Sequence, residues 1–118
     1  MPSFKPLPFE RIKGAHNPIF LLLCDHAGND VPSQWGTLGL PPERLEEHIA
    51  WDIGAANVTR RLAGLLGAPA LLSRYSRIFI DCNRALNKEK LTPEESDGVT
   101  VPGNVALDAE EKSRRANI

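Results

Sequence analysis

A run of polar residues in the second half of the chain, Asp81-Cys82-Asn83-Arg84, follows directly on the apolar segment Ile78–Ile80. The guanidinium of Arg84 is a planar fork that suits a carboxylate, and the neighbouring Asn83 amide can donate to the same anion. Side chains alternate along an extended segment, so Asp81 and Asn83 share one side and Asp81 could hold the arginine or the asparagine in place. The run therefore suggests a site for a small carboxylate, although a surface ion pair is the commoner meaning of such a run on its own.

A histidine stands in a similar position after another apolar segment. His26 follows Ile19–Cys24 and is flanked by Asp25, Asn29 and Asp30. A neutral imidazole at the end of a rigid strand, with carboxylates beside it, is a donor set for a divalent ion such as zinc. The alternative is a loop histidine that only forms hydrogen bonds.

A third candidate, Asp52, lies in the segment from about Pro42 or Glu43 to Leu66, whose apolar spacing predicts a helix. Asp52 and His48 fall inside the apolar arc of that helix. Two interpretations of Asp52 remain open: a buried structural partner of Arg77 or Arg84, or a side chain that points into a site and orients a ligand group or a metal-bound histidine. His48 is more typical of a structural histidine.

The elements that would position these residues alternate between strand and helix, which is typical of α/β architecture. The run Ile19–Cys24 predicts a strand buried on both faces. Residues 1–17 predict an extended lead-in, and 18–118 the α/β part. Further strands are predicted at 70–73 and 78–80. The long helix is predicted to end at Gly67, and another helix to begin at Asp108, where Glu111 three residues on is typical of a capped helix start.

Composition excludes several classes of protein. The 118 residues are 42% hydrophobic, which suits one folded domain, and 14 basic against 15 acidic residues give no drive toward nucleic acid or an anionic membrane. The longest apolar run is far shorter than the roughly 20 residues that span a bilayer. Two cysteines, Cys24 and Cys82, do not make a disulfide framework, and Cys24 is more typical of a core residue than of a nucleophile. We expect a reduced, cytoplasmic protein.

Taken together, four motifs over roughly residues 19 to 115 resemble the N-formylglutamate amidohydrolase family, in the family's order and at compatible spacing. No single motif would suffice. They are Leu23-Cys24-Asp25-His26-Ala27-Gly28-Asn29-Asp30-Val31-Pro32, His48-Ile49-Ala50-Trp51-Asp52-Ile53-Gly54-Ala55, Tyr75-Ser76-Arg77-Ile78-Phe79-Ile80-Asp81-Cys82-Asn83-Arg84, and Ser96-Asp97-Gly98 before Val101-Pro102-Gly103-Asn104.

The resemblance implies a mixed sheet flanked by helices, a phosphorylase/hydrolase-like fold related to the zinc carboxypeptidases and aspartoacylases. It implies hydrolysis of N-formyl-L-glutamate, or a similar N-acyl amino acid, to formate and L-glutamate, a late step in one histidine-degradation route. A zinc ion would be the cofactor, with His26 and Asn29 as ligands, Asn29 standing where relatives have glutamate. The remaining implied roles are orientation of this centre by Asp52, Arg77 and Asp81, and substrate binding by Asn83, Arg84 and Ser96.

These motifs account for only part of an active site, since no glutamate and no second histidine stands in an obvious catalytic place. We therefore expect the chain to be the N-terminal part of a longer amidohydrolase, inactive alone. The alternative is a non-catalytic domain that binds a small carboxylate.

Overall fold

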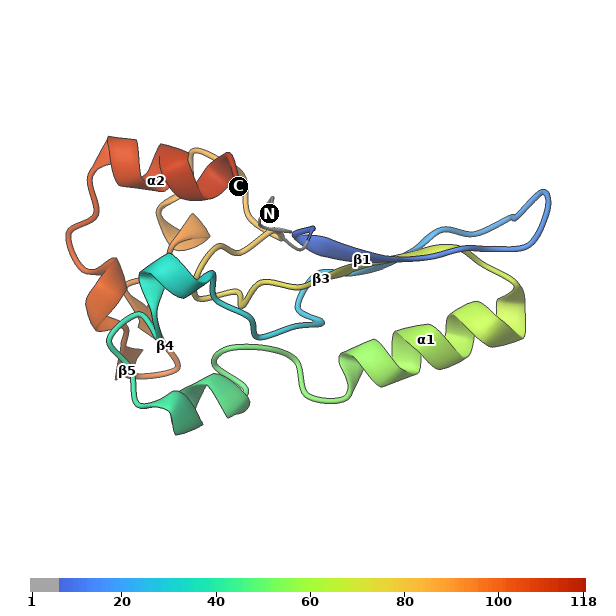
Figure 1. Ribbon diagram of the computed structural model, residues 1–118, viewed down its shortest axis with the longest axis horizontal. Coiled ribbons are helices and arrows are strands. Elements are labelled where there is room, and N and C mark those ends of the chain that lie inside the picture. The colour runs from blue at the N-terminus through green and yellow to red at the C-terminus, as the bar shows by residue number, and fades with distance from the viewer. Residues whose placement is uncertain (1–6) are drawn as a thin grey trace, which may run out of the picture.

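A three-stranded mixed sheet occupies one end of the molecule (Figure 1). The structure, a computed structural model, describes residues 7–118. The strands β1 (Phe9–Ile12), β2 (Leu22–Cys24) and β3 (Ala70–Ser73) lie in the order β1-β3-β2. The central strand β3 pairs antiparallel with β1 and parallel with β2. The strand predicted at 70–73 is thus confirmed, and β1 lies within the predicted lead-in, whose residues 1–6 are outside the described part.

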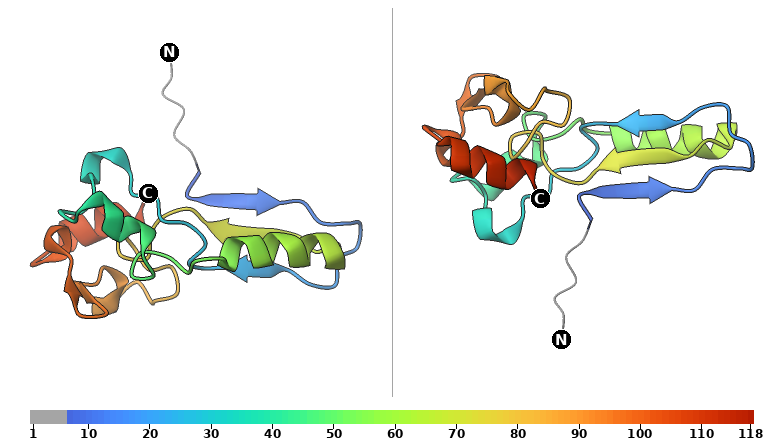
Figure 2. Two further views of the ribbon diagram at one scale, coloured as in Figure 1. Left: turned by 90° about the horizontal axis from the view of Figure 1, so that it is seen from below. Right: turned by 90° about the horizontal axis from the view of Figure 1, so that it is seen from above.

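One face of this sheet is covered by helix α1 (Ala55–Leu66), as the two views of Figure 2 show. The helix packs through its small residues, because Ala56 and Ala63 are buried in a cluster that includes Ala70 and Leu72 of β3. Its larger apolar side chains point elsewhere, and Leu65 is 77% exposed. The helix ends at Gly67, which adopts a left-handed conformation with φ of 61°, as predicted.

The predicted start of this helix is wrong. Pro42–Glu46 forms the short 3-10 helix η2, and α1 begins only at Ala55. Between them the chain turns, and Gly54 has a φ of 86°, which an α-helix does not contain. Asp52 and His48 therefore lie in turns before the helix, and they are not on its apolar arc.

The prediction that Ile19–Cys24 is a strand buried on both faces is correct only in part. A strand forms at Leu22–Cys24, but only Cys24 is buried, while Leu23 is 65% exposed. The physical reason is the position of β2 at the edge of the sheet, where α1 covers one face alone.

The strand predicted at Ile78–Ile80 is wrong as well. These residues form a turn after Ser76, whose carbonyl oxygen accepts from the amides of Phe79 (2.9 Å) and Ile80 (3.2 Å) and whose hydroxyl accepts from the Ile78 amide (3.3 Å). Ile78 and Phe79 are fully buried. The apolar run is therefore buried as predicted, but its backbone hydrogen bonds go to Ser76 and not to a neighbouring strand.

The other end of the molecule consists of short elements packed around Phe79 (Figure 1). Helix α2 (Ala109–Ala116) begins as predicted, with the Asp108 side chain accepting from the Glu111 amide at 2.8 Å. Within residues 7–118, neither α-helix is long and apolar enough to cross a membrane. The short elements are η1 (Ser33–Trp35), η2, η3 (Glu89–Leu91), β4 (Glu95–Ser96), β5 (Val99–Thr100) and η4 (Pro102–Asn104).

Candidate functional site

Three of the predicted site residues meet where the two apolar clusters of the molecule adjoin. Cys24 and Ala27, on either side of His26, belong to the cluster beneath α1. Asp52 and Asp81 follow residues of the cluster around Phe79. Asp52 and Asp81 are thus positioned by the cluster around Phe79, and both face His26, which is positioned by the cluster beneath α1.

His26 lies between the two aspartates. Its Nε2 is 2.8 Å from Oδ1 of Asp81, which is hydrogen-bond distance, and its Nδ1 is 3.4 Å from Oδ2 of Asp52. The side chains of His26 and Asp81 are largely buried, with 14% and 11% of their surface exposed, whereas that of Asp52 is half exposed. His26 and Asp52 are also joined through the backbone, because the Asp52 amide donates to the His26 carbonyl oxygen at 2.9 Å.

Asp81 connects the histidine to the Asn83-Arg84 pair. Its Oδ1 also accepts from the Asn83 amide at 3.0 Å, and its Oδ2 is 3.7 Å from Nε of Arg84. The Asp81 amide donates to the Leu91 carbonyl oxygen at 2.8 Å, which closes the intervening loop on itself. The proposed role of Asp81 in holding the arginine thus has a geometric basis.

Asp52 and Ser96 are connected through Arg77. Nη1 of Arg77 donates to Oδ1 of Asp52 at 3.3 Å, and its Nε donates to the Ile49 carbonyl oxygen at 3.1 Å. The Ser96 hydroxyl, on β4, is 3.5 Å from that same oxygen. The carboxylate thus pairs with Arg77, as the first interpretation expected, but it is half exposed and not buried; it also faces His26.

Asn29 is not part of this group. Its side-chain amide donates to the Leu45 carbonyl oxygen at 2.8 Å, so it is engaged with η2. Among the described residues, no three His, Cys, Asp or Glu side chains are arranged to hold a metal ion. His26 instead faces Asp52 on one side and Asp81 on the other.

A cavity of about 600 Å³ opens beside Asp81, in the loop that its amide closes. Asn83 and Arg84 line it, together with Lys88 and Lys90, which sequence reasoning overlooked. The signal was available, because both lysines follow the Asn-Arg pair within the same short loop. With Glu89 as the one acidic residue among them, the lining is positive and suits an anion.

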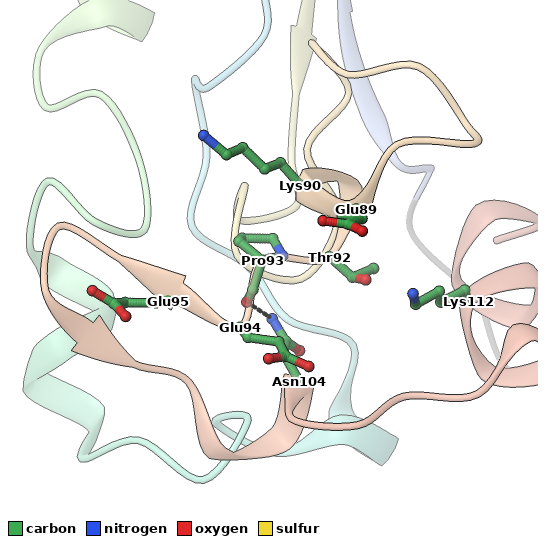
Figure 3. A pocket seen from close by; sticks show the side chains of 8 residues that line it. All are labelled: Glu89, Lys90, Thr92, Pro93, Glu94, Glu95, Asn104 and Lys112. Atoms are coloured by element: carbon green, nitrogen blue, oxygen red, sulfur yellow. Dashed lines mark hydrogen bonds between the residues drawn. The ribbon is translucent and has the colours of Figure 1, made fainter.

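A second cavity, of about 450 Å³, lies between η3, β4 and α2 (Figure 3). Its lining mixes lysines with glutamates, and Lys90 directs its ammonium group away from Lys112 (Figure 3). The side-chain amide of Asn104 donates hydrogen bonds to the carbonyl oxygens of Ile78 (2.6 Å) and Pro93 (2.7 Å). We interpret this cavity as structural, because the buried amide of Asn104 in its lining already donates to two carbonyl oxygens.

Two further titratable groups flank the site. Desolvation raises the pKa of the Cys82 thiol, and repulsion from the carboxylates of Asp25 and Asp81 adds to the shift. His48 pairs with Asp97 at 2.6 Å on the open surface, where both side chains are mostly exposed. Neither group contacts His26.

Comparison with known proteins supports the family resemblance of the four sequence motifs. Residues 19–117 match the family described as N-formylglutamate amidohydrolase. The crystal structure of a gene product from Agrobacterium tumefaciens superimposes with a TM-score of 0.88 at 35% sequence identity, covering 93% of this chain and 44% of that one. This chain thus spans less than half the length of that relative, and a search of curated proteins finds no match. Because the family match extends over most of the sequence, the chain belongs to the N-formylglutamate amidohydrolase family.

Proposed function

We propose that this chain provides the carboxylate-binding and metal-binding part of a hydrolase that cleaves N-formyl-L-glutamate, or a similar N-acyl amino acid, to formate and the amino acid. The observation that carries the proposal is the positive cavity at Asn83 and Arg84, whose arginine approaches the same Asp81 that hydrogen-bonds to His26. Carboxylate recognition and the candidate hydrolytic centre are thereby joined through one side chain. Relationship to the zinc carboxypeptidases and aspartoacylases is part of this proposal.

Arg84 binds the substrate carboxylate. Its Nε faces Asp81 at 3.7 Å, so its two terminal nitrogens remain for a bidentate contact, and about half of the side chain is exposed to a ligand. Lys88 and Lys90 line the same cavity and favour a substrate with two negative charges. Because Arg84 also faces the Asp81 that contacts His26, a carboxylate bound here would be positioned relative to that histidine, and such positioning lowers the entropic cost of reaction.

In hydrolases of this kind a zinc ion supplies polarisation of the amide carbonyl and acidification of water. To such a centre this chain would contribute His26, whose imidazole Asp81 fixes, while Arg77 fixes the neighbouring Asp52. Among the described residues no glutamate contacts His26, so we expect the isolated chain to bind substrate without turnover.

Titration of the 118-residue chain with N-formyl-L-glutamate, followed by calorimetry and by NMR, tests the binding step. We expect Arg84→Lys to weaken binding about tenfold, because a point charge does not reproduce the two parallel hydrogen bonds of the guanidinium. Arg114→Lys is the matched control, since Arg114 lies on α2 and only pairs with Glu111. Equal affinity of the Arg84 and Arg114 variants would remove Arg84 from the site.

A second assay separates the enzyme from the alternative, a non-catalytic carboxylate-binding domain. Formate release is measured for the chain with zinc and for a metal-free control. Release above the control would refute the expectation of an inactive chain. Substrate binding that neither zinc nor a histidine substitution changes would favour the binding domain.

A further inference from the structure

The motif Val101-Pro102-Gly103-Asn104 takes no part in the proposed substrate contacts, yet it ends in a buried amide. Asn104 is the last residue of η4 and is fully buried. The same short helix lies against the backbone of Leu38, where the Gly103 amide donates to the Leu38 carbonyl oxygen at 2.7 Å. A Cβ at Gly103 would come within 2.9 Å of that backbone, so glycine is required there. The amide of Asn104 is thereby held at a fixed point of the fold.

The loop that carries the candidate substrate-binding pair has no buried side chain of its own. Each of residues 82–90, here called the Asn-Arg loop, is exposed, whereas Asp81 before the loop and Leu91 after it are buried. A segment with so few buried contacts is easily displaced. The position of Asn83 and Arg84 therefore depends on the contacts that hold the two ends of the loop.

Asn104 binds both ends of the Asn-Arg loop with one amide group. Its Nδ2 donates to the Ile78 carbonyl oxygen before the loop at 2.6 Å, and to the Pro93 carbonyl oxygen after the loop at 2.7 Å (Figure 3). An amide nitrogen has two hydrogens, so both of its hydrogens are used. The Asp81 amide joins the same two ends, because it donates to the Leu91 carbonyl oxygen at 2.8 Å.

Arg115 of α2 determines the orientation of this amide. Its Nη1 donates to Oδ1 of Asn104 at 2.7 Å, and a guanidinium only donates, so the amide nitrogen must face the ends of the loop. The same Nη1 donates to the Phe79 carbonyl oxygen at 3.0 Å. Asn104 and Arg115 thus hold two successive carbonyl groups, those of Ile78 and Phe79, in the turn that leads into Asp81.

We propose that Asn104 and Arg115 are positioning residues for the carboxylate site, because they hold the backbone that directs Asp81 and, through it, Arg84. Oδ2 of Asp81 lies 3.7 Å from Nε of Arg84, and its Oδ1 accepts from the Asn83 amide. A shift of the turn at residues 78–80 therefore moves the partner that orients the guanidinium. The inference rests on the proposed function for the role of Arg84 as carboxylate ligand.

Asn104→Asp tests this role. The substitution keeps the shape of the side chain and an acceptor for Arg115, but it replaces the two N–H donors by an oxygen that cannot donate. The measurements on the ¹⁵N-labelled, 118-residue chain are the amide resonances of Asp81 and Asn83, hydrogen exchange of the Asp81 amide, and calorimetric titration with N-formyl-L-glutamate. We expect both resonances to shift, exchange to become about tenfold faster and the affinity to fall about tenfold, which is the effect of losing roughly one hydrogen bond.

Two control variants separate positioning from general stability. Leu40→Ala removes apolar contact from the cluster that contains Phe79 and leaves both ends of the Asn-Arg loop untouched. It should lower the urea midpoint of unfolding without changing the two amide resonances or the affinity. Asn117→Asp makes the same chemical change at the exposed end of α2, where the side chain contacts Ser113, and should alter neither the resonances nor the affinity.

Arg115→Lys takes over the test if circular dichroism shows that Asn104→Asp does not fold. Lysine keeps the charge but lacks the planar fork, so Asn104 and Phe79 are held less firmly. We expect the same two resonances to shift and the affinity for N-formyl-L-glutamate to fall.

The inference is overturned if the folded variant leaves the Asp81 and Asn83 resonances and the affinity unchanged, or if Leu40→Ala weakens binding as much as Asn104→Asp does. Failure of the proposed function appears separately, because the unchanged chain would then not bind N-formyl-L-glutamate. The response of the two amides to Asn104→Asp requires no substrate and would persist in that case.

Discussion

Replacing Arg115 by methionine should unfold the chain at a much lower urea concentration, because this guanidinium is buried in the second apolar cluster. The side chain is 1% exposed. Its Nη1 donates to the Phe79 carbonyl oxygen (3.0 Å) and to Oδ1 of Asn104 (2.7 Å), and its Nη2 donates to the Gly103 carbonyl oxygen (3.2 Å). The guanidinium also lies 5.0 Å from the centroid of the Phe79 ring.

Methionine keeps much of the length and apolar contact of Arg115 but leaves these three oxygens without their donor. An unsatisfied buried acceptor costs about 1–3 kcal/mol, and breaking a buried ionic contact costs about 3–5 kcal/mol. The wild-type chain already bears the cost of burying the cation, since desolvation lowers the pKa of Arg115. We therefore expect the lower end, about 3 kcal/mol, which is a large part of the roughly 5–15 kcal/mol that stabilises a typical domain.

Urea unfolding followed by tryptophan fluorescence measures the loss, because Trp35 packs edge-on against Phe79 with ring centroids 4.8 Å apart. Arg114→Met is the control. Arg114 is 62% exposed and pairs only with Glu111, so its loss should cost less than about 0.5 kcal/mol. If the free energies of unfolding of the two variants agreed within about 1 kcal/mol, the buried hydrogen bonds of Arg115 would not stabilise the fold as argued.

Two further predictions concern titration. The hydrogen bond from Trp35 lowers the pKa of Glu111. The Glu111 carboxylate therefore stabilises the fold above the ordinary glutamate pKa, and this stabilisation is lost as the pH falls through the pKa of Glu111 in the folded chain. Trp35→Phe should flatten the acid side of the plot of unfolding free energy against pH, and an unchanged plot would contradict this. Desolvation raises the pKa of the Cys82 thiol, and only the thiolate reacts with iodoacetamide. At pH 8 this thiol should therefore be alkylated more slowly in the folded chain than in urea. Equal rates would show that the fold does not suppress the thiolate.

The sequence predicted the candidate site better than the elements that carry it. His26 and Asp81 were selected because each follows an apolar segment, and that rule needs only that the segment be buried. Ile78–Ile80 is buried as a turn, so Asp81 still emerges from the core beside His26. The proximity of His26 and Asp81 was thus predictable even where the predicted strand was wrong.

Periodicity could not locate the start of α1. Residues 42–66 have helical spacing throughout, but Gly54 adopts a left-handed conformation and the preceding turns pack into a different cluster from α1. Which cluster a segment joins depends on tertiary contacts that local spacing does not encode. The same limit applies to Asn29, whose amide binds Leu45, a partner that the motif spacing did not indicate.

The error at β2 concerns solvent exposure more than strand formation. A continuous apolar run such as Ile19–Cys24 is typical of a strand with both faces covered, yet the described residues cover one face of β2 and leave Ile19 89% and Leu23 65% exposed. An apolar edge strand of this kind is a surface on which another strand can pair. The exposed row and the candidate site both belong to the segment that leads through Cys24 into His26, so whatever covers β2 would also lie next to His26. The apolar pattern of β2 and the candidate site at His26 therefore concern the same edge of the molecule.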